Sequence, residues 1–298
     1  MIYYLVAARH AYTMEEFLAT WGKPLAGRVA VLVYERVFSG EPLRLPRGTY
    51  IFTSLGGDMG SRNPPSPVRQ LASRLRDQLV SAYGPRRVLN DPQSSLRRFD
   101  LLHALYERGI NRFEAYRPAD GVAPRRYPVF LRPERGTLWT APSLLASREQ
   151  YETAVADVAA REGMLAIEFC DTADAAGIYR KYACFIVGER IVPRHLFFGR
   201  NWMVKEAELS EPRFWEEELQ FLESNPHAAL LREVSGIANI SWGRIDYALR
   251  DGQPQIWEIN VTPMIAGRIS SAIAARRPAH LKFVALLCEA LEATDRAD

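Results

Sequence analysis

The sequence has no long hydrophobic run, little net charge and few cysteines. It has no stretch of roughly 18 apolar residues, so we expect no membrane span. The formal net charge of the 298 residues is only +3, which is too small to indicate nucleic acid as a partner. Cys170, Cys184 and Cys288 lie far apart in apolar runs. This pattern predicts reduced, buried thiols in a cytoplasmic protein.

Several common catalytic motifs are absent as well. The sequence contains no GxxxxGK[ST] or GxGxxG loop, and no GxSxG or Cys–His arrangement that would indicate covalent hydrolysis. The five histidines lack metal-ligand spacing, and we expect a structural role for His195. The scattered aromatics Trp202, Trp215, Trp242 and Trp257 are interpreted as core residues rather than as base-stacking platforms.

What the sequence does contain is an alternation of short apolar runs and amphipathic segments. Its first residues, MIYYLVAARH, lack the basic start and cleavage site of a signal peptide and are typical of a strand. Composition is that of an ordinary globular protein, with 48% hydrophobic and 24% charged residues. The patterns predict strands at 2–7, 29–34, 49–53, 88–92, 128–132, 164–169 and 183–188. They predict helices at 67–83, 95–108, 212–223 and 279–293, and a further helix that begins after a Ser147 cap. A loop is predicted at 56–67.

Near the carboxyl end, two strands at 242–249 and 256–260 flank an Asp-Gly turn and form a predicted hairpin. Because alternate residues of a strand share a face, Arg244 and Asp246 lie together, as do Glu258 and Asn260. A two-residue turn would place Asp246 opposite Trp257 and mix polar with apolar residues. A three-residue turn, 251–253, places Asp246 opposite Glu258 and Arg244 opposite Asn260. We therefore predict the three-residue turn.

Directly opposed carboxylates repel each other, and a bound cation removes that repulsion. Oxygen ligands of this kind suit Mg²⁺, whose shell is commonly completed by water and phosphate oxygens. A nearby guanidinium such as that of Arg244 would stabilise an anionic intermediate. The alternative is a solvated polar face of an ordinary amphipathic hairpin, since Asp-Gly hairpins are common.

The segment GRIDYALRDGQPQIWEINVTP, taken as a whole, resembles the C-terminal signature of the ATP-grasp superfamily, and WGRID is similar to its D-alanine–D-alanine ligase version. The resemblance implies that Asp246, Glu258 and Asn260 bind the Mg²⁺ ions, or Mn²⁺ in their place, that bridge ATP. It implies that Arg244 contacts an acyl-phosphate or tetrahedral intermediate. The resemblance spans about residues 85–270.

Two arginines stand where the family has phosphate-binding lysines. The strand YPVFLRP carries Arg132 at the position of the strand lysine, and counting back from Gly109 reaches Arg98 at the earlier one. Both substitutions keep a cation that binds phosphate well. A helix-surface role for Arg98 stays open.

The adenine-binding hinge of the family resembles AIEFCD at 166–171. The resemblance implies that backbone groups near Glu168 and Cys170, with Phe169 between them, contact the adenine edge. Asp171 or Asp174 would then reach the ribose, although neither aligns cleanly.

Further cations and an amide follow the hinge. Lys181 and Arg194 lie where the family often places a phosphate or substrate cation, and Asn201 and Lys205 are further candidates. Each could equally be a surface group. Two departures from the family pattern are a glycine loop reduced to Arg135-Gly136-Thr137, and VTPMI after Asn260 in place of a small residue followed by Pro-Gly.

The resemblance implies an α/β (α+β) ATP-grasp fold. A Rossmann-like pre-ATP-grasp domain is expected at 1–88 and an ATP-grasp domain at 89–298, with a lid at about 126–170 and a C-terminal subdomain at about 171–298. The implied reaction is ATP-dependent amide or peptide bond formation from a small-molecule carboxylate and an amine, with no nucleic acid or membrane partner. A homodimer, a small-molecule kinase on the same scaffold and a nucleotide-binding protein without turnover stay open.

Overall fold

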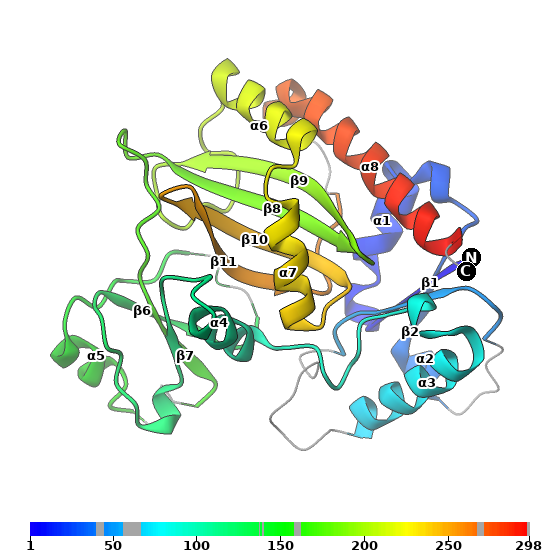
Figure 1. The fold of residues 1–298 in the computed structure, drawn as a ribbon, viewed down its shortest axis with the longest axis horizontal. Helices are drawn as coiled ribbons and strands as arrows, with labels where there is room; N and C mark the ends of the chain where they lie inside the picture. Colours follow the sequence, from blue (N-terminus) through cyan, green and yellow to red (C-terminus); the bar gives the residue numbers. More distant parts are fainter. Residues whose placement is uncertain are drawn as a thin grey trace.

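The computed structural model describes residues 1–39, 45–55, 67–136, 138, 140–157, 162–266 and 271–296. Most of the predicted loop at 56–67, and Thr137 of the shortened glycine loop, lie outside these residues. The described chain forms three sheets with helices around them, one parallel and two antiparallel (Figure 1). The α/β class predicted from the sequence is confirmed.

The amino-terminal sheet has the strand order β2-β1-β3-β4, and all of its strands are parallel. Successive residues of β1 point to opposite faces of the sheet and pack into two different hydrophobic cores. Ile2 and Tyr4 pack toward α1 and the central sheet, whereas Leu5 packs with Phe52 against α3. The Rossmann-like label for this sheet stays a prediction. Its elements are β1 (Ile2–Val6), α1 (Tyr12–Thr20), β2 (Val29–Val33), α2 (Tyr34–Val37), β3 (Thr49–Phe52), α3 (Pro67–Tyr83) and β4 (Val88–Leu89).

A small sheet of order β5-β7-β6 follows, with a helix on each face. Leu165 and Ile167 of β7 pack against α4, and Ala166 between them packs toward α5. The predicted cap of α5 is confirmed, because the Ser147 side chain accepts from the Gln150 N–H at 3.3 Å. The elements are α4 (Arg98–Glu107), β5 (Ala115–Tyr116), β6 (Val129–Pro133), α5 (Arg148–Ala154) and β7 (Met164–Glu168).

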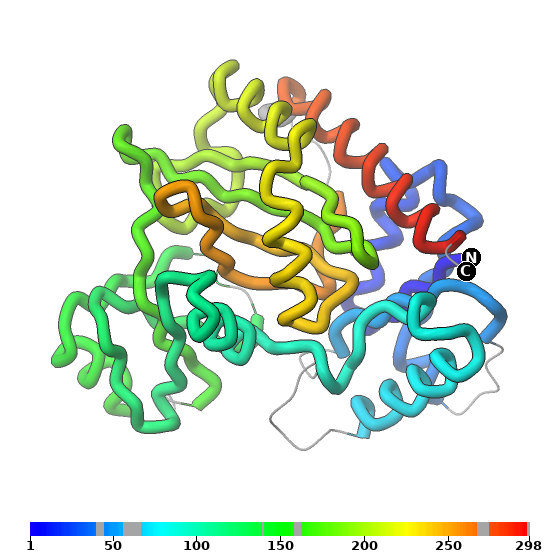
Figure 2. The backbone as a smooth tube through the Cα atoms, in the orientation of Figure 1, coloured from blue at the N-terminus to red at the C-terminus, as the bar shows by residue number. Residues whose placement is uncertain are grey.

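The central sheet has the order β11-β10-β8-β9 and is covered by α6, α7 and α8 (Figure 1). Helix α4 contacts both β11 and α7, so it lies between the small and central sheets. Helix α8 brings the end of the chain beside its start (Figure 2). There the Met1 ammonium lies 2.7 Å from Asp295 Oδ1. The elements are β8 (Tyr179–Val187), β9 (Arg190–Gly199), α6 (Pro212–Ser224), α7 (Ala228–Ala238), β10 (Trp242–Arg250), β11 (Gln253–Asn260) and α8 (Arg277–Arg296).

Short 3-10 helices connect several of these elements: Ala8–His10, Lys23–Leu25, Pro85–Arg87, Pro118–Asp120 and Ser271–Arg276. Among the described helices, none is both long and apolar enough to cross a membrane.

Candidate functional site

The β10–β11 hairpin has the predicted pairing but not the predicted turn. Asp246 is opposite Glu258 and Arg244 is opposite Asn260. Arg250 pairs with Gln253, however, so the turn has two residues and the prediction of three was wrong. A β-bulge at Trp257 supplies the missing residue and restores the separation of polar and apolar faces.

Asp246 is 3% exposed, and two cations hold it. Arg244 donates to both carboxylate oxygens, at 2.7 and 3.0 Å, from the same strand. Lys181 lies 2.9 Å from Oδ2, because it shares a face of β8 with Ala183, which is opposite Asp246. Burial by itself would raise the pKa of Asp246, but Arg244 and Lys181 outweigh it and lower the pKa to about 2. The carboxylate is therefore ionised at neutral pH.

Glu258 is held by cations from the small sheet and from α4. Arg98, the first residue of α4, donates to Oε2 of Glu258 and to the backbone carbonyl of Glu134 at 2.8 Å. Arg132 of β6 lies 3.6 Å from the same Oε2. Burial and the neighbouring Arg98 lower the pKa of Arg132 to about 10. The two arginines at the family's lysine positions thus converge on one predicted metal ligand.

Cations outnumber carboxylates around this point. Lys205 also lines the pocket, and its pKa is lowered by partial burial and by Lys181. Arg194 lies in a second β-bulge, between the paired Pro193 and His195, and donates to the Ile265 carbonyl at 3.0 Å. Burial and the nearby Arg244 lower its pKa to about 9. Such a surplus of positive charge favours a polyanionic ligand.

The opposite end of the same pocket is apolar and aromatic. The Trp202 ring lies 4.9 Å from Phe130 and 5.5 Å from Phe169, between centroids. The space in and around the pocket is about 780 Å³, which includes open solvent at its mouth. Its lining comprises Phe130, Arg132, Leu138, Phe169, Cys170, Thr172, Tyr179, Arg180, Lys181, Trp202, Met203, Val204, Lys205, Asp246, Ala248, Trp257 and Glu258.

Several candidate residues have other contacts. The Glu168 side chain is 3% exposed and accepts from Arg126 and Tyr116, so it takes part in a buried network behind the hinge. Asp171 accepts the Ala173 N–H at 3.0 Å and Asn201 the Met203 N–H at 2.9 Å, in their own turns.

Asp174 pairs with Arg180 at 2.6 Å. Phe169 and Cys170, in contrast, line the pocket. The hinge segment therefore divides between residues that face the pocket and residues that face away from it.

The carboxylates fit a hard divalent cation by donor chemistry. A carboxylate offers about four lone-pair sites, and Asp246 uses three of them for Arg244 and Lys181. Both ion pairs of Glu258 use Oε2, so Oε1 has no hydrogen-bond donor among the described residues. Asn260 Oδ1 accepts the Thr262 N–H at 2.9 Å and retains a second lone pair. These oxygens could hold Mg²⁺ together with phosphate oxygens.

Sequence reasoning missed the aromatic wall of this pocket. It assigned Trp202 and Trp257 to the core; both do pack against the core of the small sheet, but both also line the cavity. The bulge aligned Glu258 with Asp246, and Trp257 in that bulge stacks on Phe113 at 4.7 Å between centroids. The sequence contained one signal of the bulge. A regular hairpin with a two-residue Asp-Gly turn would mix polar and apolar side chains on both faces, so one strand needed an extra residue.

No family sequence model and no curated protein matches the chain by sequence. Solved structures do match it along nearly its whole length. D-alanine–D-alanine ligase from Bacillus anthracis complexed with ATP has a TM-score of 0.53 at 12% identity, covering 100% of this chain and 99% of that one. D-cycloserine synthetase DcsG has a TM-score of 0.52 at 17% identity, covering 98% and 100%.

The ATP-grasp ligase PsnB, complexed with a phosphomimetic variant of a minimal precursor, Mg and ADP, has a TM-score of 0.53 at 12% identity. The match covers 99% of this chain and 97% of PsnB. The chain therefore has the ATP-grasp fold, and the resemblance inferred from the hairpin is confirmed at the level of the fold.

Proposed function

We propose that this protein is an ATP-dependent ligase that joins a small-molecule carboxylate to an amine. The observation that carries the proposal is one pocket with an aromatic end and a cationic end, with paired carboxylates between the cations. A flat apolar base, an anionic triphosphate and a divalent cation match these three features in order. The ATP and Mg–ADP complexes of proteins with the same fold support this choice of ligand.

In the proposed complex, adenine lies against Phe130, Phe169 and Trp202 at the hinge end. The phosphates extend toward four cations: Arg98, Arg132, Lys181 of β8, and Lys205 in the loop after β9. The buried Nε atoms of both arginines have no acceptor among the described residues, so they can donate to phosphate oxygens. Ribose contacts from Asp171 or Asp174 stay a prediction.

The chemistry follows from where the charges lie. The substrate carboxylate attacks the γ-phosphorus, ADP leaves, and the amine nitrogen then attacks the acyl carbon while phosphate leaves and the amine loses a proton. Bound Mg²⁺, or Mn²⁺, would neutralise phosphate charge during transfer. Arg244 is held in place by Asp246 and would stabilise the developing negative charge near the acyl carbon. Arg194, close to Arg244, would orient the acid.

We also propose that residues of about 126–170 act as a lid over a C-terminal subdomain of about 171–298, with 1–88 as a separate amino-terminal domain. The pocket lining supports a lid, since Phe130 and Arg132 come from the small sheet and Lys181 and Asp246 from the central one. Closure of the two sheets would exclude water from the transferring phosphoryl group.

The test is ATP consumption in the presence of separate pools of small acids and amines. We expect Mg²⁺-dependent release of ADP and phosphate that requires both an acid and an amine, with a condensed product detectable by mass spectrometry. A stable phosphorylated product formed without an amine would indicate a small-molecule kinase instead. Absence of Mg–ATP binding in calorimetry would overturn the nucleotide site itself.

A further inference from the structure

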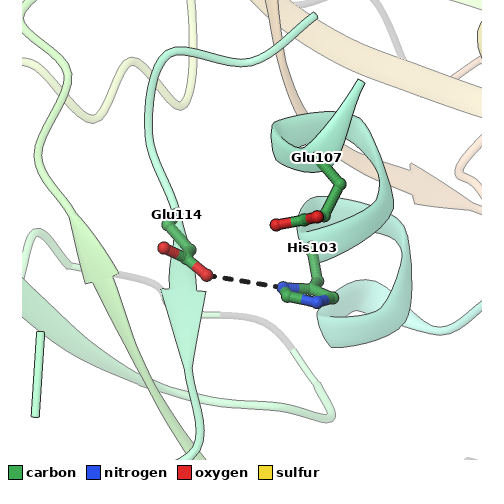
Figure 3. Close-up of side chains that lie close together, drawn as sticks. All are labelled: His103, Glu107 and Glu114. Carbon is green, nitrogen blue, oxygen red and sulfur yellow. Dashed lines mark ion pairs between the residues drawn. The ribbon is translucent and has the colours of Figure 1, made fainter. Parts of the chain in front are cut away.

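A second group of possible metal ligands lies outside the pocket, where α4 faces the segment that leads into β5. His103 and Glu107 are four residues apart and share one face of α4. Glu114 faces them from the other side (Figure 3). One ligand atom from each residue lies within 4.8 Å of the other two. No residue of this group lines the proposed nucleotide pocket.

Glu114 lacks the cation that a buried carboxylate ordinarily has. It is 6% exposed, and among the described residues its only ion-pair partner is His103. Its Oε2 accepts from the Tyr116 hydroxyl at 2.9 Å, but the same hydroxyl also lies 3.0 Å from Glu168. One hydroxyl proton cannot serve both carboxylates at once. Arg126 compensates Glu168, and Glu114 has no such partner in the described chain.

The separation between His103 and Glu114 also suits two ligands of one ion better than a direct hydrogen bond. His103 Nδ1 lies 3.5 Å from Glu114 Oε1, which is long for a hydrogen bond, and this buried nitrogen has no hydrogen-bond partner among the described residues. Ligand bonds of about 2.0–2.2 Å in a tetrahedral site place neighbouring ligand atoms roughly 3.3–3.5 Å apart. Glu107 is exposed and free to change rotamer.

We propose that His103, Glu107 and Glu114 bind a divalent transition-metal ion, with Zn²⁺ as the occupant that one imidazole and two carboxylates best suit. Water would complete the shell. The ion would supply the positive charge that Glu114 lacks. It would also fasten α4 to the segment before β5, and so brace the helix whose first residue, Arg98, contacts Glu258. The inference of this metal site does not rest on the proposed ligase activity.

The test uses the full chain without a histidine tag, stripped of metal with EDTA and then titrated with Co²⁺ or Zn²⁺ alone. We expect one Co²⁺ per chain, with visible absorption bands of low-coordinate geometry that Zn²⁺ abolishes. Glu107→Gln changes only an exposed side chain, so it should fold normally. We expect it to weaken Zn²⁺ binding at least tenfold, and His103→Ala to remove the absorption bands.

Two matched controls distinguish this site from other sources of binding. His10→Ala removes a histidine far from the group and should leave Zn²⁺ affinity unchanged. Asp246→Asn disrupts the carboxylate pair of the nucleotide pocket and should also leave the Co²⁺ spectrum unchanged. The proposal is overturned if Glu107→Gln and His103→Ala bind Zn²⁺ as tightly as the parent chain. It is overturned equally if the parent chain shows no Co²⁺ spectrum, because His103 and Glu114 then form only an ion pair.

Discussion

Asp246 and Glu258 face each other across the hairpin, yet each is held by a different pair of cations. Asp246 takes its partners from within the central sheet, Arg244 and Lys181. Glu258 takes Arg98 and Arg132 from α4 and β6. The ion pairs of Glu258 join the small sheet to the central one, so they form only when the two sheets lie close together. The ion pairs of Asp246 lie within the central sheet and do not depend on the position of the small sheet.

The first prediction concerns these two carboxylates. Asp246→Asn or Glu258→Gln should lower Mg–ATP turnover roughly 100-fold or more, because each removes a metal ligand and leaves two cations without a counter-charge. Turnover is measured by ADP release, with circular dichroism to verify the fold. The control is Asp251→Asn, an exposed carboxylate of the same hairpin that pairs with Arg112. Full activity in either pocket variant would show that the hairpin does not hold the metal.

At the scale of elements, both strands that flank the site carry a bulge. Trp257 is the extra residue of β11, and Arg194 is the extra residue of β9. A bulge turns one side chain out of regular alternation, and bulges are frequent beside functional sites. Here one bulge places an aromatic ring in the pocket wall, and the other places a guanidinium near Arg244. Strict alternation along the sequence predicts neither position.

A prediction follows for the turn. Asp251 and Gly252 both have positive φ, at 50° and 74°, as the two-residue hairpin turn requires. Gly252→Ala should destabilise the protein by roughly 1 kcal/mol, since a Cβ strains that backbone even though nothing crowds it. Gly236→Ala is the matched control, because Gly236 lies within α7 with open space at its Cβ.

The control should stabilise the helix by about 0.5–1 kcal/mol. Urea denaturation measures both variants. If Gly252→Ala and Gly236→Ala changed the free energy of unfolding equally and with the same sign, that result would contradict a turn with positive φ at Gly252.

At the scale of the whole molecule, α8 ties the end of the chain to its beginning. His280 of this helix packs edge-on against Trp21, the residue that caps the end of α1, at 4.5 Å between centroids. Burial, with Arg194 and Arg276 nearby, lowers the pKa of His280 to about 4. The unfolded chain binds this proton near pH 6.5, well before the folded chain does. Protonation therefore favours unfolding as the pH falls from 6.5 toward 4.

His280→Phe should remove part of this pH dependence while keeping the contact with Trp21. We expect the parent chain to lose roughly 2 kcal/mol more stability than the variant between pH 7 and pH 4.5. Urea denaturation at the two pH values measures the difference. His195, whose pKa is also lowered by burial, titrates in both proteins and cancels in the comparison. An identical loss in the two proteins would exclude His280 as a contributor.

The sequence by itself determined every strand of the three sheets in outline except β5 and β9, together with the cap at Ser147 and the pairing of Asp246 with Glu258. These follow from alternation, local capping and the separation of polar from apolar faces, which depend on residues close in the chain or on one hairpin. Helices α1 and α7 escaped prediction, because tertiary packing outweighs local propensity there. The turn length was predicted wrongly because strict alternation was assumed along β11, whereas the bulge at Trp257 interrupts it.

Tertiary structure alone decided which distant side chains share the pocket. Arg98 and Arg132 reach Glu258 only because α4 and β6 lie beside the hairpin, and Trp202 becomes pocket wall only because its loop faces Phe130. It also turned Glu168 away into a buried network with Tyr116 and brought Glu114 opposite His103. Contacts between residues far apart in sequence depend on how sheets pack, and no local pattern encodes that packing.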